Sequence, residues 1–148
     1  LDDFIVADDV REIGEALIAE WSELAHCEDI RIVYVWRRKK QAKAGKVILG
    51  TCARLSGELR ALYKADWRIC LNAENCREAR LTCWQIEALV YHELLHIGPP
   101  DDEEDPDAEP VIVGHDIEMF HQEVRRYGFW KADIARTAEV FEQLRLAM

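Results

Sequence analysis

Two histidines four residues apart, His92 and His96, are the residues whose type and spacing most clearly suggest chemistry. On an α-helix of 3.6 residues per turn they project from the same face, so both imidazoles can bind one metal ion. Glu93 completes the pattern H-E-x-x-H and lies about 100° around the helix from His92, beside that ion. Imidazole is a common zinc ligand, and a glutamate in this place can act as general base toward a zinc-activated water. The pattern therefore predicts zinc-dependent hydrolysis.

The residues on either side of the motif predict the helix that carries it. Thr82 is a good N-cap, and Gln85 three residues later completes a capping box. Gly98 and the two prolines after it are typical of a helix end. We therefore predict a helix over 83–97. The alternative is a core helix whose buried histidines only form hydrogen bonds, and this helix context favours the metal site.

A catalytic zinc usually takes three protein ligands, so one more ligand is needed. The next segment with ordered character, 111–121, contains His115, Glu118 and His121. If it is helical, His115 and Glu118 share a face whereas His121 points elsewhere. Asp116 is a candidate acceptor for the second N–H of a ligand imidazole, or a helix cap. Helical phase alone leaves His115 and Glu118 as alternatives.

The motifs together resemble known families. H-E-x-x-H followed by His-x-x-x-x-Phe, here His115 and Phe120, is similar to SprT-like zinc metalloproteases, which are HExxH zincins. The resemblance to the phage-encoded metallopeptidase domain is closer and covers nearly the whole chain, including 50–62, the motif helix and 126–130. It implies a single zincin-like domain over 1–148 that binds one Zn²⁺. It also implies that His115 is the third ligand, beside the two motif histidines.

The implied function is that of a zinc metallopeptidase, which hydrolyses peptide bonds with a metal-activated water and Glu93 as general base. Its partner would be a peptide or protein substrate, and zinc proteases often align such a substrate along an exposed edge strand beside the metal. Tyr127 and Arg125 are candidate donors to the tetrahedral intermediate, with a plain surface position as the alternative.

The elements that must position these residues predict an α+β fold. Val10, Ile13 and Leu17 recur at helical spacing, which predicts an N-terminal helix capped by Asp8 or Asp9 and continuing to about His26. The stretches 30–36 and 46–53 read as strands joined in a hairpin, and 66–72 as a third strand directly before the motif helix. We expect a small three-stranded sheet, mixed or antiparallel, packed against the N-terminal and motif helices.

C-terminal helices are predicted after the sheet and the motif helix. The first should end near Tyr127, with Gly128 after its last turn. The second should cover 131–146 and place an apolar face inward, formed by Ile134, Ala138, Phe141 and Leu144.

Composition narrows the classes of function. The chain has 148 residues, enough for one domain, and its net charge of −10 argues against a general affinity for nucleic acid. Five cysteines without a C-x-x-C pair fit a reducing cytoplasm, in a bacterial host cell if the protein is phage- or prophage-encoded. A zinc site from Cys70, Cys76 and Cys83 has no usual spacing. Neither a signal peptide nor a membrane span is recognisable, so no membrane partner is expected.

Two segments of the chain carry charge of mainly one sign. The connection 37–46 is basic, and its Arg37, Arg38, Lys39 and Lys40 form a candidate anion-binding patch. This supports an alternative function, a non-hydrolytic zinc-containing module that binds a host protein or nucleic acid through the 37–46 loop; a solvated hairpin tip is the other interpretation. The segment 99–110 is acidic and proline-bounded, and we expect a mobile lid or linker there.

Overall fold

The computed structural model describes residues 3–148. They form two compact units, one that ends at Val113 and one that comprises Gly114–Met148. Each unit is described by itself.

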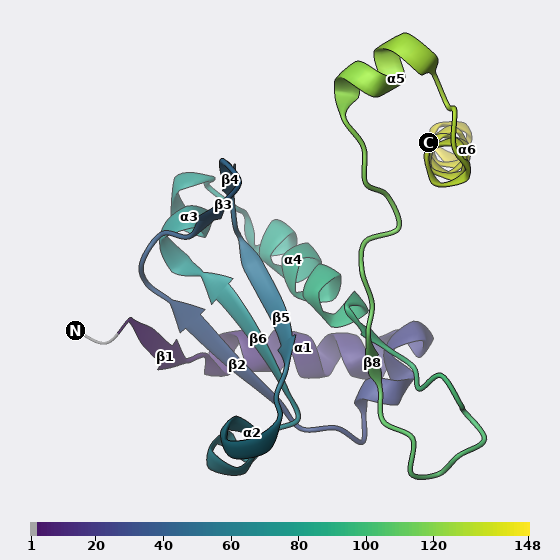
Figure 1. Ribbon diagram of the computed structural model, residues 1–148. Coiled ribbons are helices and arrows are strands. Elements are labelled where there is room, and N and C mark those ends of the chain that lie inside the picture. The colour runs from purple at the N-terminus through teal and green to yellow at the C-terminus, as the bar shows by residue number, and fades with distance from the viewer. Residues whose placement is uncertain (1–2) are drawn as a thin grey trace. The chain divides into compact units, whose positions relative to one another are not determined.

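The first unit is built on a mixed four-stranded sheet (Figure 1). Its strand order is β1 (Phe4–Val6), β2 (Ile32–Arg37), β6 (Trp67–Asn72) and β5 (Gly50–Arg54). β2 and β6 are parallel, whereas β1 and β5 lie antiparallel to their neighbours. The α+β class is confirmed. The prediction of three strands was wrong because β1, a three-residue edge strand, carries too short a pattern to detect.

The predicted hairpin of 30–36 with 46–53 is also wrong, because β6 lies between β2 and β5. β6 is the most deeply buried strand, with Ile69 and Leu71 inaccessible to solvent, so it occupies the centre of the sheet. The hairpin that does form is smaller: β3 (Ala42–Lys43) pairs with β4 (Lys46–Val47). Its two loop residues both have positive φ, as a tight two-residue turn requires.

Two long helices, α1 (Asp8–Glu20) and α4 (Cys83–Leu95), pack against each other and against the sheet. Ala7 rather than an aspartate precedes α1 as its N-cap, and Asp9 instead accepts a 3.0 Å hydrogen bond from the indole of Trp36. The helix stops at Glu20, earlier than predicted, and a 3-10 helix, η1 (Ser22–Cys27), follows. The shared core of helices and sheet is formed by residues that include Val10, Leu17, Leu24, Tyr34, Trp67, Ile69, Val90 and Leu94.

Shorter elements close the first unit. Helix α2 (Gly57–Tyr63) follows β5, and α3 (Ala73–Glu78) follows β6. After α4, the strand β7 (Ile97–Gly98) pairs antiparallel with β8 (Val111–Ile112), so the acidic segment between them forms a closed loop. In the part of the chain described, no helix is both long and apolar enough to cross a membrane.

Two buried asparagines attach the basic 37–46 segment to the sheet. The side chain of Asn72 caps α3 by accepting from Asn75 N–H at 2.9 Å and donates to the carbonyl of Lys39 at 2.6 Å. The amide of Asn75 donates to the carbonyls of Gln41 and Ile48, both at 2.8 Å. These three hydrogen bonds to partly buried carbonyls attach the segment to the sheet.

The second unit contains α5 (His121–Tyr127) and α6 (Ala132–Ala147). As predicted, α5 ends at Tyr127 and is followed by Gly128, whose φ is +65°. Within α6, Ile134 is buried, but Phe141 and Leu144 are 64% and 57% exposed, so the predicted inward face is correct only in its first turn. Residues 114–120 form no helix, which contradicts the predicted helical segment there.

Removing the amide of Asn75 tests how the basic segment is attached. Asn75→Ala should lower the free energy of unfolding by about 1–3 kcal/mol, because two hydrogen bonds to the partly buried carbonyls of Gln41 and Ile48 are lost. Arg77→Ala on the exposed side of the same helix, where an i,i+3 ion pair with Glu74 is lost, should cost no more than about 0.5 kcal/mol. Urea unfolding of both variants checks this, and equal midpoints would contradict it.

Candidate metal centre

The helix α4 carries the motif and starts as predicted. Thr82 Oγ1 accepts from Gln85 N–H at 3.2 Å, and the Gln85 side chain accepts from Thr82 N–H at 2.8 Å. This capping box fixes the first turn of α4. The regular helix that follows then determines the directions in which the motif side chains project. His92 lies in the last turn and His96 at the C-cap, and their ring centroids are 5.2 Å apart with planes inclined by 78°.

Val113, the residue that follows strand β8, orients His96. Its Nδ1 lies 2.6 Å from the carbonyl oxygen of Val113, and its own carbonyl accepts from Val113 N–H at 2.8 Å. A carbonyl can only accept, so Nδ1 carries the proton and Nε2 has the lone pair that a metal needs. Such a contact also holds the ring in one orientation.

His92, His96 and His115 form a cluster that could hold a metal ion, with one nitrogen of each within 4.8 Å of the others. Tetrahedral zinc has Zn–N distances of about 2.0–2.1 Å, which place ligand nitrogens about 3.3 Å apart. Imidazole nitrogen is a usual zinc donor, so the three residues are a donor set that this ion accepts. A catalytic zinc site with three protein donors keeps its fourth position for water or substrate.

The helix that left His115 and Glu118 as alternatives does not form, and the choice of His115 came from the family resemblance. His115 follows β8 in an extended segment, and neither Asp116 nor Glu118 belongs to the histidine cluster among the residues described. The backbone carbonyl of Glu118 instead accepts from Lys131 Nζ at 2.9 Å. The roles of Asp116 and Glu118, as a group that supports a ligand imidazole or as an alternative ligand, therefore stay predictions.

Glu93 is 3% exposed, although its neighbour His92 is open to solvent. Burial raises the pKa of its carboxyl, and the electrostatic effect of the nearby His96 opposes part of that increase. Gly50 on β5 makes room for it: a Cβ there would lie 3.2 Å from Glu93 Oε1, 3.0 Å from Leu71 Cδ2 and 3.3 Å from the Cys70 carbonyl. The absence of a side chain at Gly50 thus lets the carboxylate reach the edge strand.

A groove of about 490 Å³ opens beside this carboxylate. One wall is the segment 47–50 and the other is α4, which contributes residues from Gln85 to Glu93. β5 is the edge strand of the sheet on this side. Asn72 N–H donates to the Leu49 carbonyl and Leu55 N–H to the Asp66 carbonyl, so alternate residues of β5 bond to β6. The N–H and C=O groups of the intervening residues, Gly50, Cys52 and Arg54, therefore face the open edge.

The cysteines are free thiols, and Cys27, Cys70 and Cys76 are buried, as expected of small apolar side chains. Burial raises the pKa of Cys52 to about 12 and that of Cys27 to about 11; the nearby charge of Glu93 contributes at Cys52. No cysteine belongs to the metal cluster among the described residues.

The predicted basic patch is partly neutralised within the chain. Arg37 pairs with Asp3 at 3.3 Å, and Lys40 pairs with Glu78. Arg38 and Lys39 are exposed. Arg125 and Tyr127, the predicted donors, lie in α5, where Tyr127 is exposed and its neighbour Arg126 lies over its ring. Their role stays a prediction.

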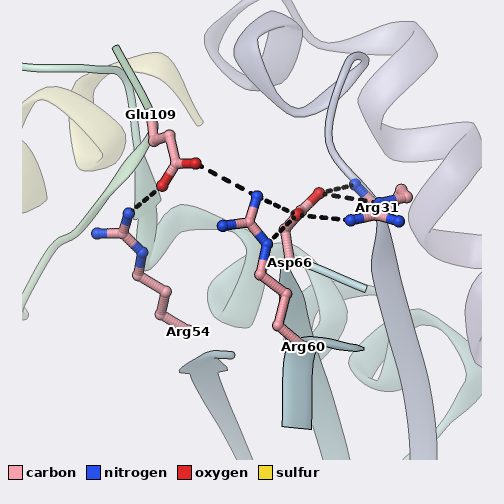
Figure 2. Close-up of polar contacts among 5 residues, drawn as sticks. All are labelled: Arg31, Arg54, Arg60, Asp66 and Glu109. Atoms are coloured by element: carbon pink, nitrogen blue, oxygen red, sulfur yellow. Dashed lines mark hydrogen bonds and ion pairs between the residues drawn. The ribbon is translucent and has the colours of Figure 1, made fainter. Parts of the chain in front are cut away.

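Two arginines that we did not single out from the sequence hold the end of the acidic loop (Figure 2). Glu109 pairs with Arg54 at the end of β5 and with Arg60 of α2, the latter at 3.3 Å. Asp66 pairs with Arg60 at 3.0 Å and with Arg31 at 3.1 Å. The expected mobile segment is therefore anchored at this end, beside the buried Pro110. Pairs this distant in sequence leave no local pattern to detect.

Comparison with known proteins identifies one family, described as "Putative phage metallopeptidase", whose match covers residues 2–142. The match spans parts of both units. Searches of curated proteins and of solved structures found no match.

Replacing the candidate third ligand tests the cluster. His115→Ala should lower zinc affinity far more than Glu118→Ala, for which at most the roughly 10–100-fold loss of a supporting group is expected. Titration of the metal-loaded proteins with a chelator measures both. The reverse ranking would transfer the ligand role to Glu118.

The contact between Gly50 and Glu93 can be tested by a double-mutant cycle. Gly50→Ala should lower the free energy of unfolding by about 1–3 kcal/mol, because the added methyl group overpacks the site. Glu93→Asp shortens the facing side chain, so the double variant should be more stable than the sum of the two changes predicts. Thr51→Ala is the control, since Thr51 points to the other face of β5. Strict additivity would contradict the contact.

Proposed function

Because the chain belongs to the putative phage metallopeptidase family, we propose that it hydrolyses peptide bonds with a zinc ion held by His92, His96 and His115. The observation that carries this proposal is the position of Glu93. It is a nearly inaccessible carboxylate, between two metal-binding histidines, at the wall of an open groove. A carboxylate is costly to bury, so its retention here favours a chemical role over a structural one.

In this mechanism the residues of the chain have separate tasks. A zinc ion bound by the histidines would supply Lewis-acid activation of water and of the scissile carbonyl. Glu93 accepts the proton of the attacking water and then donates it to the leaving amine. Burial favours this second step, because a carboxyl whose pKa is raised holds a proton more readily. The carbonyl of Val113 keeps His96 in the tautomer that binds metal.

The open edge of β5 is the surface on which we propose that the substrate lies. An extended peptide can pair with the outward N–H and C=O groups of Gly50, Cys52 and Arg54 and so extend the sheet. A Cβ at Gly50 would lie 3.2 Å from Glu93 Oε1, so pairing at this point would bring a peptide bond beside the proposed base. The apolar groove wall of Val47, Ile48, Leu81 and Leu89 would receive a side chain next to that bond.

The alternative, a non-hydrolytic module that binds through the 37–46 loop, has less support. Arg37 and Lys40 are already paired within the chain, and the buried asparagines hold the segment in place. A purely structural zinc site also has no use for Glu93.

The decisive experiment replaces the carboxylate of the proposed base with an amide of nearly the same shape. Glu93→Gln should lower peptide hydrolysis by about 10²–10⁴-fold and keep one zinc per chain, because the residue acts on water and does not bind the metal. Cleavage of a peptide library, read by mass spectrometry, and elemental analysis measure the two effects. Glu87→Gln, on the exposed face of the same helix, is the control. Loss of zinc in Glu93→Gln would show that Glu93 is a ligand, and unchanged cleavage would refute its role as base.

A further inference from the structure

Arg54 lies on the proposed substrate strand, away from the proposed base. Residues 50, 52 and 54 alternate onto one face of β5, and Gly50 shows that this is the face of Glu93. At about 3.4 Å per residue, Arg54 is about 14 Å from Gly50 along the strand. Consider a peptide paired with β5, with one of its residues opposite Gly50. The residue four positions away along that peptide would then lie next to the guanidinium of Arg54.

The second arginine, Arg60, converges on the same point from α2. Figure 2 shows both guanidinium groups directed at the carboxylate of Glu109. Arg60 also binds Asp66, whereas Glu109 is the sole ion-pair partner of Arg54 within residues 3–148. The three arginines and two acids of the cluster carry a net charge of +1, and Asp29 and Asp107 in the adjoining hollow bring the sum to −1.

A hollow beside Arg54 and Arg60 offers space for a ligand. Arg54, Arg60 and Glu109 line a hollow of about 440 Å³ together with loop residues that include Pro106 and Pro110. Asp29 and Asp107 line it as well, so an acidic group is attracted only where it reaches the guanidinium groups themselves. Arginine is suited to this, because its planar fork matches a carboxylate.

We propose that Arg54 and Arg60 form a carboxylate subsite for the substrate, which Glu109 occupies when no substrate is bound. The proposal rests on the proposed peptidase function and names its substrate class: extended peptides with an acidic residue about four positions from the cleaved bond. If the peptide runs antiparallel to β5, this residue lies on the amino side of that bond. Glu109 then acts as an internal competitor, since the subsite binds a substrate carboxylate only in the fraction of molecules in which Glu109 has left.

The test uses pairs of peptides derived from one that the library shows to be cleaved, with Glu or Gln at positions three to five on either side of the cleaved bond. The wild-type protein should have a kcat/KM about three- to tenfold higher for the Glu peptide at one position. Arg60→Gln should reduce this ratio toward one. Glu109→Gln should lower the KM of the Glu peptide severalfold and leave that of the Gln peptide near its wild-type value.

Glu103→Gln is the matched control, since it removes the same charge from the same loop and Glu103 has no ion pair within the described residues. It should leave the Glu/Gln ratio unchanged. Equal cleavage of Glu and Gln peptides at every position would overturn the subsite, and so would a Glu109→Gln effect equal for both peptides, which would make Glu109 only a structural contact. Thermal unfolding of each variant identifies loss of the fold.

The proposed function can fail separately. If no library peptide is cleaved, the peptidase proposal fails, and fluorescence anisotropy with the labelled Glu and Gln peptides then tests the subsite by itself. Tighter binding of the Glu peptide that Arg60→Gln abolishes would support the subsite. Equal binding of both peptides would overturn it.

Discussion

The paired hydrogen bonds between His96 and Val113 are the constraint on which the candidate metal centre depends. They join the end of α4 to the chain just after β8, on the far side of the acidic loop. One bond sets the tautomer of a metal-binding imidazole, and the other fixes the backbone two residues before His115. Without this closure, the third histidine would be joined to the first two only through a long polar loop, with a correspondingly larger entropy cost for metal binding.

Features set by neighbouring residues could be predicted from the sequence. The capping box of Thr82 and Gln85, the motif phase and the end of α5 at Tyr127 all depend on contacts within a few positions. His115 was chosen from a family pattern, and the helical argument offered for the segment was wrong. Its placement comes from the pairing of β7 with β8, across an insertion in which no periodic pattern indicates where the chain returns.

The arrangement of the sheet could not be predicted for a related reason. β2 and β5 are consecutive regular strands of the main sheet, which favours a hairpin, yet β6 separates them because its apolar side chains need cover on both faces. The short strand β1 and the donors Asn72 and Asn75 depend on partners more than 25 residues away. The edge position of β5, which determines where a peptide could pair, follows from this strand order and is not visible in the strand's own sequence.

The buried thiols bear on how the protein would acquire and keep its metal. Thiolates are strong zinc ligands and are also the form that oxidants attack, but Cys52 and Cys27 have pKa values of about 12 and 11 and stay protonated at neutral pH. Sulfur near the carboxylate of Glu93 therefore neither diverts the ion from the imidazoles nor forms adducts readily. The imidazoles of the histidine cluster are therefore the groups on which metal uptake would depend.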